Sequence, residues 1–152
     1  MFTEVAPDSP EAREAMSRYY AELDERFEDG FDPGPPAPED AEMRFVVFLG
    51  EDTSDTGHHR VLAGGGVREY GGAAEVKRMW VSPDARGQRL GTRLLAYLED
   101  VAREMGFETV RLDTRGAALP EAVALYEKAG YVRIERYNDN PHATHFFAKS
   151  LV

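Results

Sequence analysis

The spacing of apolar residues predicts two long amphipathic helices. Apolar side chains recur close to every 3.6 residues from Pro10 to Phe27 and again from Gln88 to Met105. Asp8 or Ser9 is suited to capping the first helix, and Gly106 to ending the second. Each helix is therefore expected to bury one face and expose the other.

Runs of β-favouring residues between turn residues predict strands. The runs cover residues 2–6, 44–49, 61–70, 73–81, 109–113, 131–137 and 144–151, and a short helix is expected from Pro120 to before Gly130. This order of elements indicates one α/β (α+β) domain over residues 1–152, with a mixed central sheet of about six to seven strands flanked by helices.

Alternation along 73–81 predicts which side chains share a face of the sheet. Glu75, Lys77, Met79 and Val81 fall on one face, and Val76, Arg78 and Trp80 on the other. In the preceding strand, Gly64-Gly65-Gly66 indicates a bulge or close packing.

Two polar segments lie outside these elements. Residues 30–42 contain four prolines and cannot continue the first helix, so they form either a lid or a plain connector. His58 and His59 lie in a turn without matched ligand spacing, so no metal site is predicted.

Composition and charge exclude several classes of protein. The chain has no cysteine, which excludes a disulfide framework, thiol catalysis and Cys-ligated zinc. No apolar run could span a bilayer and no signal peptide is evident, so a cytoplasmic protein without membrane contact is expected. The net charge of −10 argues against nucleic acid as a partner.

The charge is unevenly distributed along the chain. Residues 1–75 hold 18 acidic and 6 basic residues, whereas residues 76–152 hold 10 and 12. Such a division suits an anionic cofactor that meets a cationic or neutral substrate.

The segment 81–92, VSPDARGQRLGT, has the pattern of an anion site. Arg86, Arg89 and Arg93 lie at the start of a helix, where the macrodipole favours anions over cations. Gly87 allows close backbone approach, so a phosphate or pyrophosphate is a suitable ligand. The alternative is a solvated basic helix end with nothing bound.

Three motifs in order resemble the GNAT superfamily of acyl-coenzyme A-dependent N-acetyltransferases. Arg86 to Gly91 is similar to the acetyl-coenzyme A motif Gln/Arg-x-x-Gly-x-Gly/Ala, and it follows the run EVKRMWV, which starts at Glu75. AVALYEKAGY, ending at Tyr131, is similar to the family's Leu-Tyr-x-x-x-Gly-Phe/Tyr segment. Two positions depart from the pattern, since Arg89 replaces a glycine and Leu119 stands where many members have Asn.

The resemblance implies acetyl-coenzyme A as co-substrate, no metal, and a sheet splayed at the coenzyme site. A main-chain N–H near Met79 would stabilise the oxyanion as the amine attacks the thioester directly through a tetrahedral intermediate. The implied coenzyme-binding residues are Met79, Trp80, Val81, Arg86, Gly87, Gln88, Arg89, Leu90, Gly91 and Thr92.

The resemblance also implies two catalytic side chains. Glu75 is the candidate general base, and its alternative role is a strand-face ion pair with Lys77 or Arg78. Tyr126 is the candidate acid beside the coenzyme sulfur, and its alternative role is core packing.

The acceptor is expected to be a small primary amine or amino compound. Residues that could contact it lie in the first helix, the proline-rich loop and the connection before the last strand, namely Tyr19, Tyr20, Phe31, Asn138, Asn140, His142 and His145. The protein would be a monomer or homodimer. A non-catalytic acyl-coenzyme A sensor or partner-binding module is the alternative, and a nucleotide-binding protein is a third reading that lacks a P-loop motif.

Overall fold

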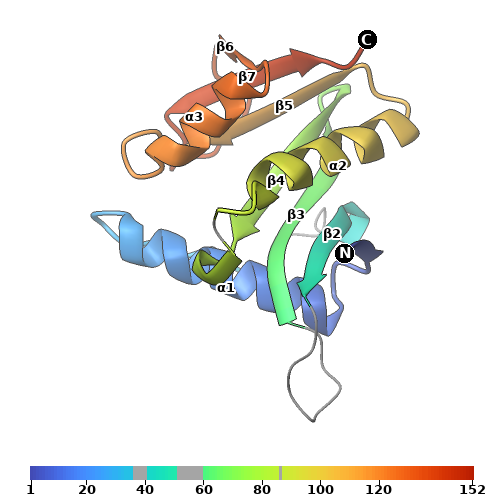
Figure 1. Ribbon diagram of the computed structural model, residues 1–152. Helices are drawn as coiled ribbons and strands as arrows, with labels where there is room; N and C mark the ends of the chain where they lie inside the picture. Colours follow the sequence, from blue (N-terminus) through green and yellow to red (C-terminus); the bar gives the residue numbers. More distant parts are fainter. Residues whose placement is uncertain (36–40, 51–59, 86) are drawn as a thin grey trace.

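Strands from both halves of the chain join one mixed sheet in the computed structural model, which describes residues 1–35, 41–50, 60–85 and 87–152. Over these ranges seven strands lie in the order β1-β2-β3-β4-β5-β7-β6 (Figure 1). Among these strands only β4 and β5 are parallel neighbours. The predicted mixed sheet is therefore confirmed. The strands are β1 (Phe2–Val5), β2 (Arg44–Gly50), β3 (Arg60–Tyr70), β4 (Ala73–Val81), β5 (Thr109–Thr114), β6 (Val132–Ile134) and β7 (His145–Ser150).

The helices begin and end close to the predicted residues. They are α1 (Pro10–Arg26), α2 (Leu90–Glu104) and α3 (Pro120–Lys128), with a 3₁₀ turn, η2 (Pro83–Ala85), before α2. Ser9 caps α1, because its Oγ accepts a hydrogen bond of 3.2 Å from the N–H of Ala12. α2 starts two residues later than predicted, because Arg89 has a left-handed backbone (φ 54°) that no helix can include.

The helices cover opposite faces of the sheet and bury two cores (Figure 1). On the α1 face, Ala15 packs with Phe45 and Trp80. On the α2 and α3 face, Leu94 and Tyr126 belong to one larger core. The described helices include none that is long and apolar enough to cross a membrane.

A bulge in β4 overturns the predicted sharing of faces along that strand. Gly66 pairs with Lys77 and Gly64 with Trp80, so Gly65 alone lies opposite two residues, Arg78 and Met79. Arg78 has a positive φ of 59°, which accommodates the additional residue.

After the bulge, each side chain of β4 points to the face of the sheet opposite to the one predicted. Met79 and Val81 pack on the α2 face, as Val76 does, whereas Trp80 packs on the α1 face. Glu75 alternates with Val76 before the bulge and therefore lies on the face opposite Met79. The expected alignment of Glu75 with Met79 and Val81 is wrong.

The penultimate strand is shorter than predicted. Residues 131–137 were expected to be extended, but β6 ends at Ile134. The Arg136 guanidinium then donates hydrogen bonds to the carbonyls of Asn140 (2.9 Å) and Ala143 (3.0 Å). These contacts hold the chain in a loop that leads to β7.

Candidate active site

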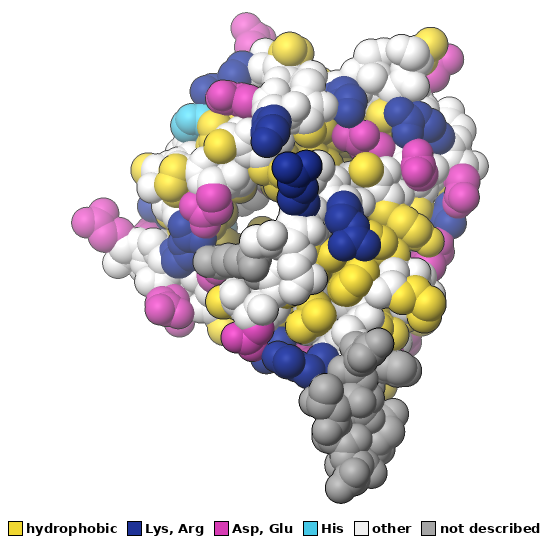
Figure 2. Space-filling view, in the orientation of Figure 1, with side chains coloured by type: hydrophobic (Ala, Val, Ile, Leu, Met, Phe, Trp, Pro, Cys, Tyr) yellow, Lys and Arg dark blue, Asp and Glu magenta, His cyan; other side chains and the backbone are white. Residues whose placement is uncertain are grey.

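A separation of β4 from β5 opens a cavity through the middle of the sheet. The two strands pair only through Ala74 with Val110 and Glu75 with Arg111. Beyond these pairs the edge of β4 faces a cavity of about 760 Å³, which α1, α3 and the loops after α1 and β6 also line. The space-filling view shows a hollow on this side, with Lys and Arg side chains beside it (Figure 2). The splayed sheet expected from the sequence is confirmed.

One end of the cavity has the features of an anion cradle. Gly87 (φ 93°) and Arg89 (φ 54°) both have left-handed backbones, and they lead into a first turn of α2 that contains no acidic residue. Gly91 lies close to α3, since a Cβ there would be 3.4 Å from Cδ2 of Leu125. A helix start with main-chain N–H groups and no carboxylate favours a phosphate group. The residues present therefore fit a pyrophosphate.

Most of the predicted coenzyme-binding residues line this cavity. They are Met79, Trp80, Val81, Gly87, Arg89, Leu90, Gly91 and Thr92. Gln88 is exposed and is not part of the wall, and Arg86 lies outside the described residues. Arg93, expected to add to the anion site, instead stacks over Phe2 and Phe48, with its Cζ 5.5 and 5.4 Å from the ring centroids.

Tyr126 lies in the cavity wall on α3. Its side chain is buried, and its ring lies against Tyr131 and Phe147 at centroid distances of 6.0 and 5.9 Å. Burial raises the pKa of the Tyr126 hydroxyl above its ordinary value, and the carboxylate of Asp113 raises it further. The hydroxyl therefore remains protonated over the physiological pH range. Tyr126 thus lines the cavity, as the candidate acid would have to, and also packs in the core, as its alternative role requires.

Glu75 does not line the cavity. Its side chain is 1% exposed, and Oε1 accepts a hydrogen bond of 2.9 Å from Nε of Arg68. Oε2 accepts hydrogen bonds from the Tyr137 hydroxyl (2.6 Å) and from Nδ2 of Asn138 (3.0 Å). Both oxygens are engaged, so the geometry does not favour a general base here. The alternative ion pair with Lys77 is present, with Nζ 3.7 Å from Oε2.

Sequence reasoning missed Asp113, a carboxylate that does line the cavity. Asp113 lies near the end of β5, and its Oδ2 accepts hydrogen bonds from Asn138 Nδ2 (2.6 Å) and Lys77 Nζ (3.3 Å). The available signal was alternation, since Arg111 and Asp113 are charged residues on one face of an otherwise buried strand. Only the separation of the strands shows that this face opens into a cavity.

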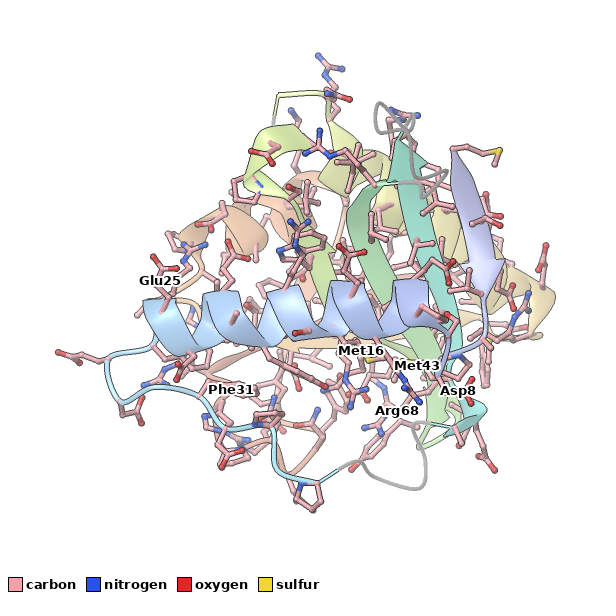
Figure 3. The ribbon with its side chains drawn as sticks, turned by 90° about the horizontal axis from the view of Figure 1, so that it is seen from below. Asp8, Met16, Glu25, Phe31, Met43 and Arg68 are labelled. Atoms are coloured by element: carbon pink, nitrogen blue, oxygen red, sulfur yellow. The ribbon has the colours of Figure 1, made fainter. Side chains whose placement is uncertain are left out.

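The residues expected to contact the acceptor divide into two groups. Tyr19, Tyr20, Phe31, Asn140 and His142 line the cavity. Phe31 lies on the segment that turns back along α1, and its ring centroid is 4.9 Å from that of His142 (Figure 3). Asn138 is buried behind the wall, and His145 lies on β7, where its Nδ1 is 2.8 Å from Oγ1 of Thr144. These last two residues therefore do not line the cavity, contrary to what contact with the acceptor would require.

Two predictions from the sequence fall wholly or partly on undescribed residues. His58 and His59 lie outside the described ranges, as do residues 36–40 of the proline-rich loop. Within the described ranges, no group of three or more His, Asp or Glu side chains could hold a metal ion.

Comparison with known proteins identifies the family. The model of the acetyltransferase (GNAT) family matches residues 8–131. An IAA acetyltransferase of Azospirillum brasilense is 48% identical over 61 residues, which are 40% of this chain and 39% of that protein. An uncharacterized N-acetyltransferase of Schizosaccharomyces pombe is 35% identical over 86 residues, which are 55% of this chain and 52% of that protein. The matches thus span about half or less of these relatives' lengths.

A solved structure shares the whole fold. The aminoglycoside 6′-N-acetyltransferase complexed with coenzyme A superposes with a TM-score of 0.65 at 17% identity, covering 100% of this chain and 97% of that one. At this identity the likeness concerns the fold, and the family match carries the assignment. The splayed sheet, the cradle before α2 and the matched residues 8–131 agree, and the chain belongs to the GNAT acetyltransferase family.

Proposed function

We propose that this protein transfers an acetyl group from acetyl-coenzyme A to the amino group of a small amine. The observation that carries the proposal is the cavity between β4 and β5, which joins the anion cradle at α2 to the hydroxyl-bearing wall at Tyr126. Membership of the GNAT family supports acyl-coenzyme A as the donor. A solved relative by fold that holds coenzyme A is consistent with it.

The cavity would hold the coenzyme at two places. Main-chain N–H groups at the start of α2 and the guanidinium of Arg89 would bind the pyrophosphate. The edge of β4 from Met79 to Val81, which β5 leaves unpaired, would hydrogen-bond the pantetheine arm as a neighbouring strand would. Both sets of groups line one cavity, so a single extended ligand could reach them together.

The donor supplies a thioester, which an amine can attack without an acyl-enzyme step. A C–N bond forms first and gives a tetrahedral intermediate, and the C–S bond then breaks. The amine nitrogen loses a proton to water, and the departing sulfur gains one from Tyr126. Tyr126 would give the sulfur its proton, since its raised pKa keeps the hydroxyl protonated until the thiolate forms. A main-chain N–H near Met79 would stabilise the negative charge on the carbonyl oxygen.

The proposal is tested by incubating the protein with acetyl-coenzyme A and a panel of primary amines while free thiol is measured. Amine-dependent thiol release supports acetyl transfer, and propionyl-coenzyme A in the same assay reports acyl preference. Trp80 is the only tryptophan and lies in the cavity wall, so its fluorescence reports coenzyme binding separately. Tight coenzyme binding without turnover on any amine would favour an acyl-coenzyme A sensor instead.

A further inference from the structure

In the side chain of Asp113, which lines the cavity, one carboxylate oxygen accepts hydrogen bonds from the described part of the protein and the other does not. Its side chain is 8% exposed, and Oδ2 accepts hydrogen bonds from Asn138 Nδ2 (2.6 Å), Lys77 Nζ (3.3 Å) and Asn140 Nδ2 (3.4 Å). Among the described residues no donor reaches Oδ1. A carboxylate fixed by three donors through one oxygen has acceptor capacity left on the other. Because Asp113 lines the cavity, that capacity suits a donor group of a ligand.

Asp113 shares its cavity with the proposed reaction centre. Asp113, Tyr126 and Tyr19 all line this cavity, and the charge of Asp113 raises the pKa of both tyrosine hydroxyls. Tyr126 is the group proposed to protonate the sulfur, so a ligand on Asp113 would occupy the same cavity as the acyl group.

Aromatic rings form the wall beyond Asp113. Tyr20 and Phe31 stack at a centroid distance of 5.7 Å, and Phe31 meets Phe27 at 5.7 Å. Both His142 and Tyr19 also line this part of the cavity. A carboxylate beside aromatic rings favours a cation that carries apolar groups, through ion pairing with the carboxylate and packing of those groups against the rings.

Glu75 supports Asp113 from behind the cavity wall. Nδ2 of Asn138 donates to Oε2 of Glu75 (3.0 Å) and to Oδ2 of Asp113 (2.6 Å), so one amide joins the two carboxylates. Lys77 lies between the same two carboxylates and reduces their mutual repulsion. Glu75 thus fixes the amide that orients Asp113.

We propose that Asp113 binds the ammonium group of the acceptor, with Glu75 as a positioning residue that acts through Asn138. The acceptor is then a primary amine with an apolar or aromatic substituent, which packs against Phe31 and its neighbours. This inference rests on the proposed function for its biological meaning. The binding site itself can be tested without acyl transfer.

The test measures binding of benzylammonium and of uncharged benzyl alcohol to the complete chain by calorimetry. The wild-type protein is expected to bind benzylammonium more tightly than the alcohol. Asp113→Asn is expected to weaken benzylammonium binding about ten- to hundred-fold, the effect of losing a hydrogen bond to a charged group, and to leave the alcohol unchanged. The matched control is Asp100→Asn, an exposed carboxylate on α2 paired with Arg103, which is expected to change neither.

Two further variants separate positioning from folding. Lys77→Met removes the cation that competes for Asp113, so benzylammonium binding is expected to tighten by about two- to fivefold. Asn138→Ala is expected to weaken benzylammonium binding and leave alcohol binding unchanged, because it removes the amide through which Glu75 orients Asp113. Thermal melts establish whether each variant is folded. If Asp113→Asn does not fold, the binding measured for Lys77→Met tests the inference instead.

The outcomes distinguish this inference from the proposed function. The inference is overturned if wild-type protein does not bind benzylammonium, if Asp113→Asn binds it as tightly as wild type, or if Lys77→Met weakens it. Equal losses for benzylammonium and the alcohol in Asn138→Ala would remove the positioning role. Charge-selective binding without acetyl transfer to any amine would leave the site standing and reject the enzyme. If Asp113→Asn left acetyl transfer unchanged, the enzyme activity would stand and the proposed site on Asp113 would be rejected.

Discussion

The Tyr137 hydroxyl donates a hydrogen bond of 2.6 Å to Oε2 of Glu75, and it does so across 62 residues of sequence. Arg68 donates a hydrogen bond to the other oxygen, Oε1, so both oxygens of this almost fully buried carboxylate have donors. The contact ties the loop after β6 to the first half of β4. It is therefore a structural contact next to the cavity, not a contact within it.

Replacing Glu75 with Ala is expected to lower the free energy of unfolding by about 3–5 kcal/mol, because the cations of Arg68 and Lys77 lose their buried partner. Tyr137→Phe removes only one hydrogen bond to the charged group and is expected to cost about 1–3 kcal/mol. Urea titrations of both variants provide the measurement. A cost for Glu75→Ala no larger than that for Tyr137→Phe would show that the ion pairs contribute little.

Alkaline pH is expected to destabilise the protein through its buried tyrosines. Burial raises the pKa of Tyr126 and, together with Glu99, that of Tyr131, so each hydroxyl ionises later in the folded than in the unfolded chain. The contribution of each tyrosine to the free energy of unfolding is fully present below about pH 10. Above that pH it falls by about 1.4 kcal/mol per pH unit, because the tyrosine ionises first in the unfolded chain.

The control for this prediction is Tyr131→Phe. It removes the hydroxyl that donates to Oε2 of Glu99 over 2.8 Å, so it lowers stability at neutral pH but makes the alkaline loss less steep. Denaturant titrations between neutral pH and about pH 11 supply both values. An alkaline slope equal to that of wild type would mean that Tyr131 ionises as freely in the folded chain as in the unfolded one.

A glycine in β3 sets how closely α1 approaches the sheet. A Cβ on Gly64 would lie 2.7 Å from Cβ of Ala15, an atom that can move only if α1 moves. Gly64→Ala is therefore expected to cost about 1–3 kcal/mol through overpacking. Gly66→Ala is a contrast, since its Cβ would meet the Met43 side chain, which has rotatable bonds to relax.

The compensating variant is Ala15→Gly in α1. Alone it is expected to cost about 1 kcal/mol of helix propensity. Combined with Gly64→Ala it removes the clashing atom, so the double variant is expected to be more stable than the sum of the two single effects predicts. Strictly additive costs in thermal or urea unfolding would show that the two Cβ positions do not meet.

The sequence predicts the elements of this fold well because each long helix and strand carries its own local pattern. Ser9 and Pro10 mark the start of α1, and Gly106 marks the end of α2. The bulge is different. Gly64-Gly65-Gly66 indicated an irregularity in β3, but the additional residue lies in β4 at Arg78, which has no glycine to mark it. Side-chain alternation past that point was consequently misassigned.

The candidate site was predictable where it depends on local backbone and not where it depends on strand separation. The cradle before α2 follows from a contiguous motif, and Tyr126 from a short helix with a clear apolar stripe. Asp113 and Glu75 are both acidic residues within strands, Asp113 near the end of β5 and Glu75 near the start of β4. Which of them reaches the cavity depends on where β4 leaves β5, and no local pattern encodes that point.

Arg89 has a conformation that favours glycine, which makes its replacement informative. Its φ of 54° costs a side-chain-bearing residue about 1 kcal/mol relative to glycine. Arg89→Gly is thus expected to leave the melting temperature unchanged or raise it. Coenzyme A affinity should fall about ten-fold, since one charge-assisted contact to phosphate is lost. Trp80 fluorescence and thermal melts measure the two effects, and a lower melting temperature with unchanged affinity would exclude Arg89 from the cradle.

Tyr126 is expected to influence turnover more than binding. Tyr126→Phe keeps the ring that packs against Phe147 but removes the proton donor, so kcat should fall about a hundred-fold, as for loss of a general acid. Coenzyme affinity, followed through Trp80, should change less than about threefold, because the hydroxyl is not expected to contact the pyrophosphate. Since the raised pKa keeps this hydroxyl protonated, the wild-type rate should show no alkaline decline from Tyr126 below about pH 10. Equal losses in kcat and coenzyme affinity would indicate that the tyrosine shapes the cavity and does not give the sulfur its proton.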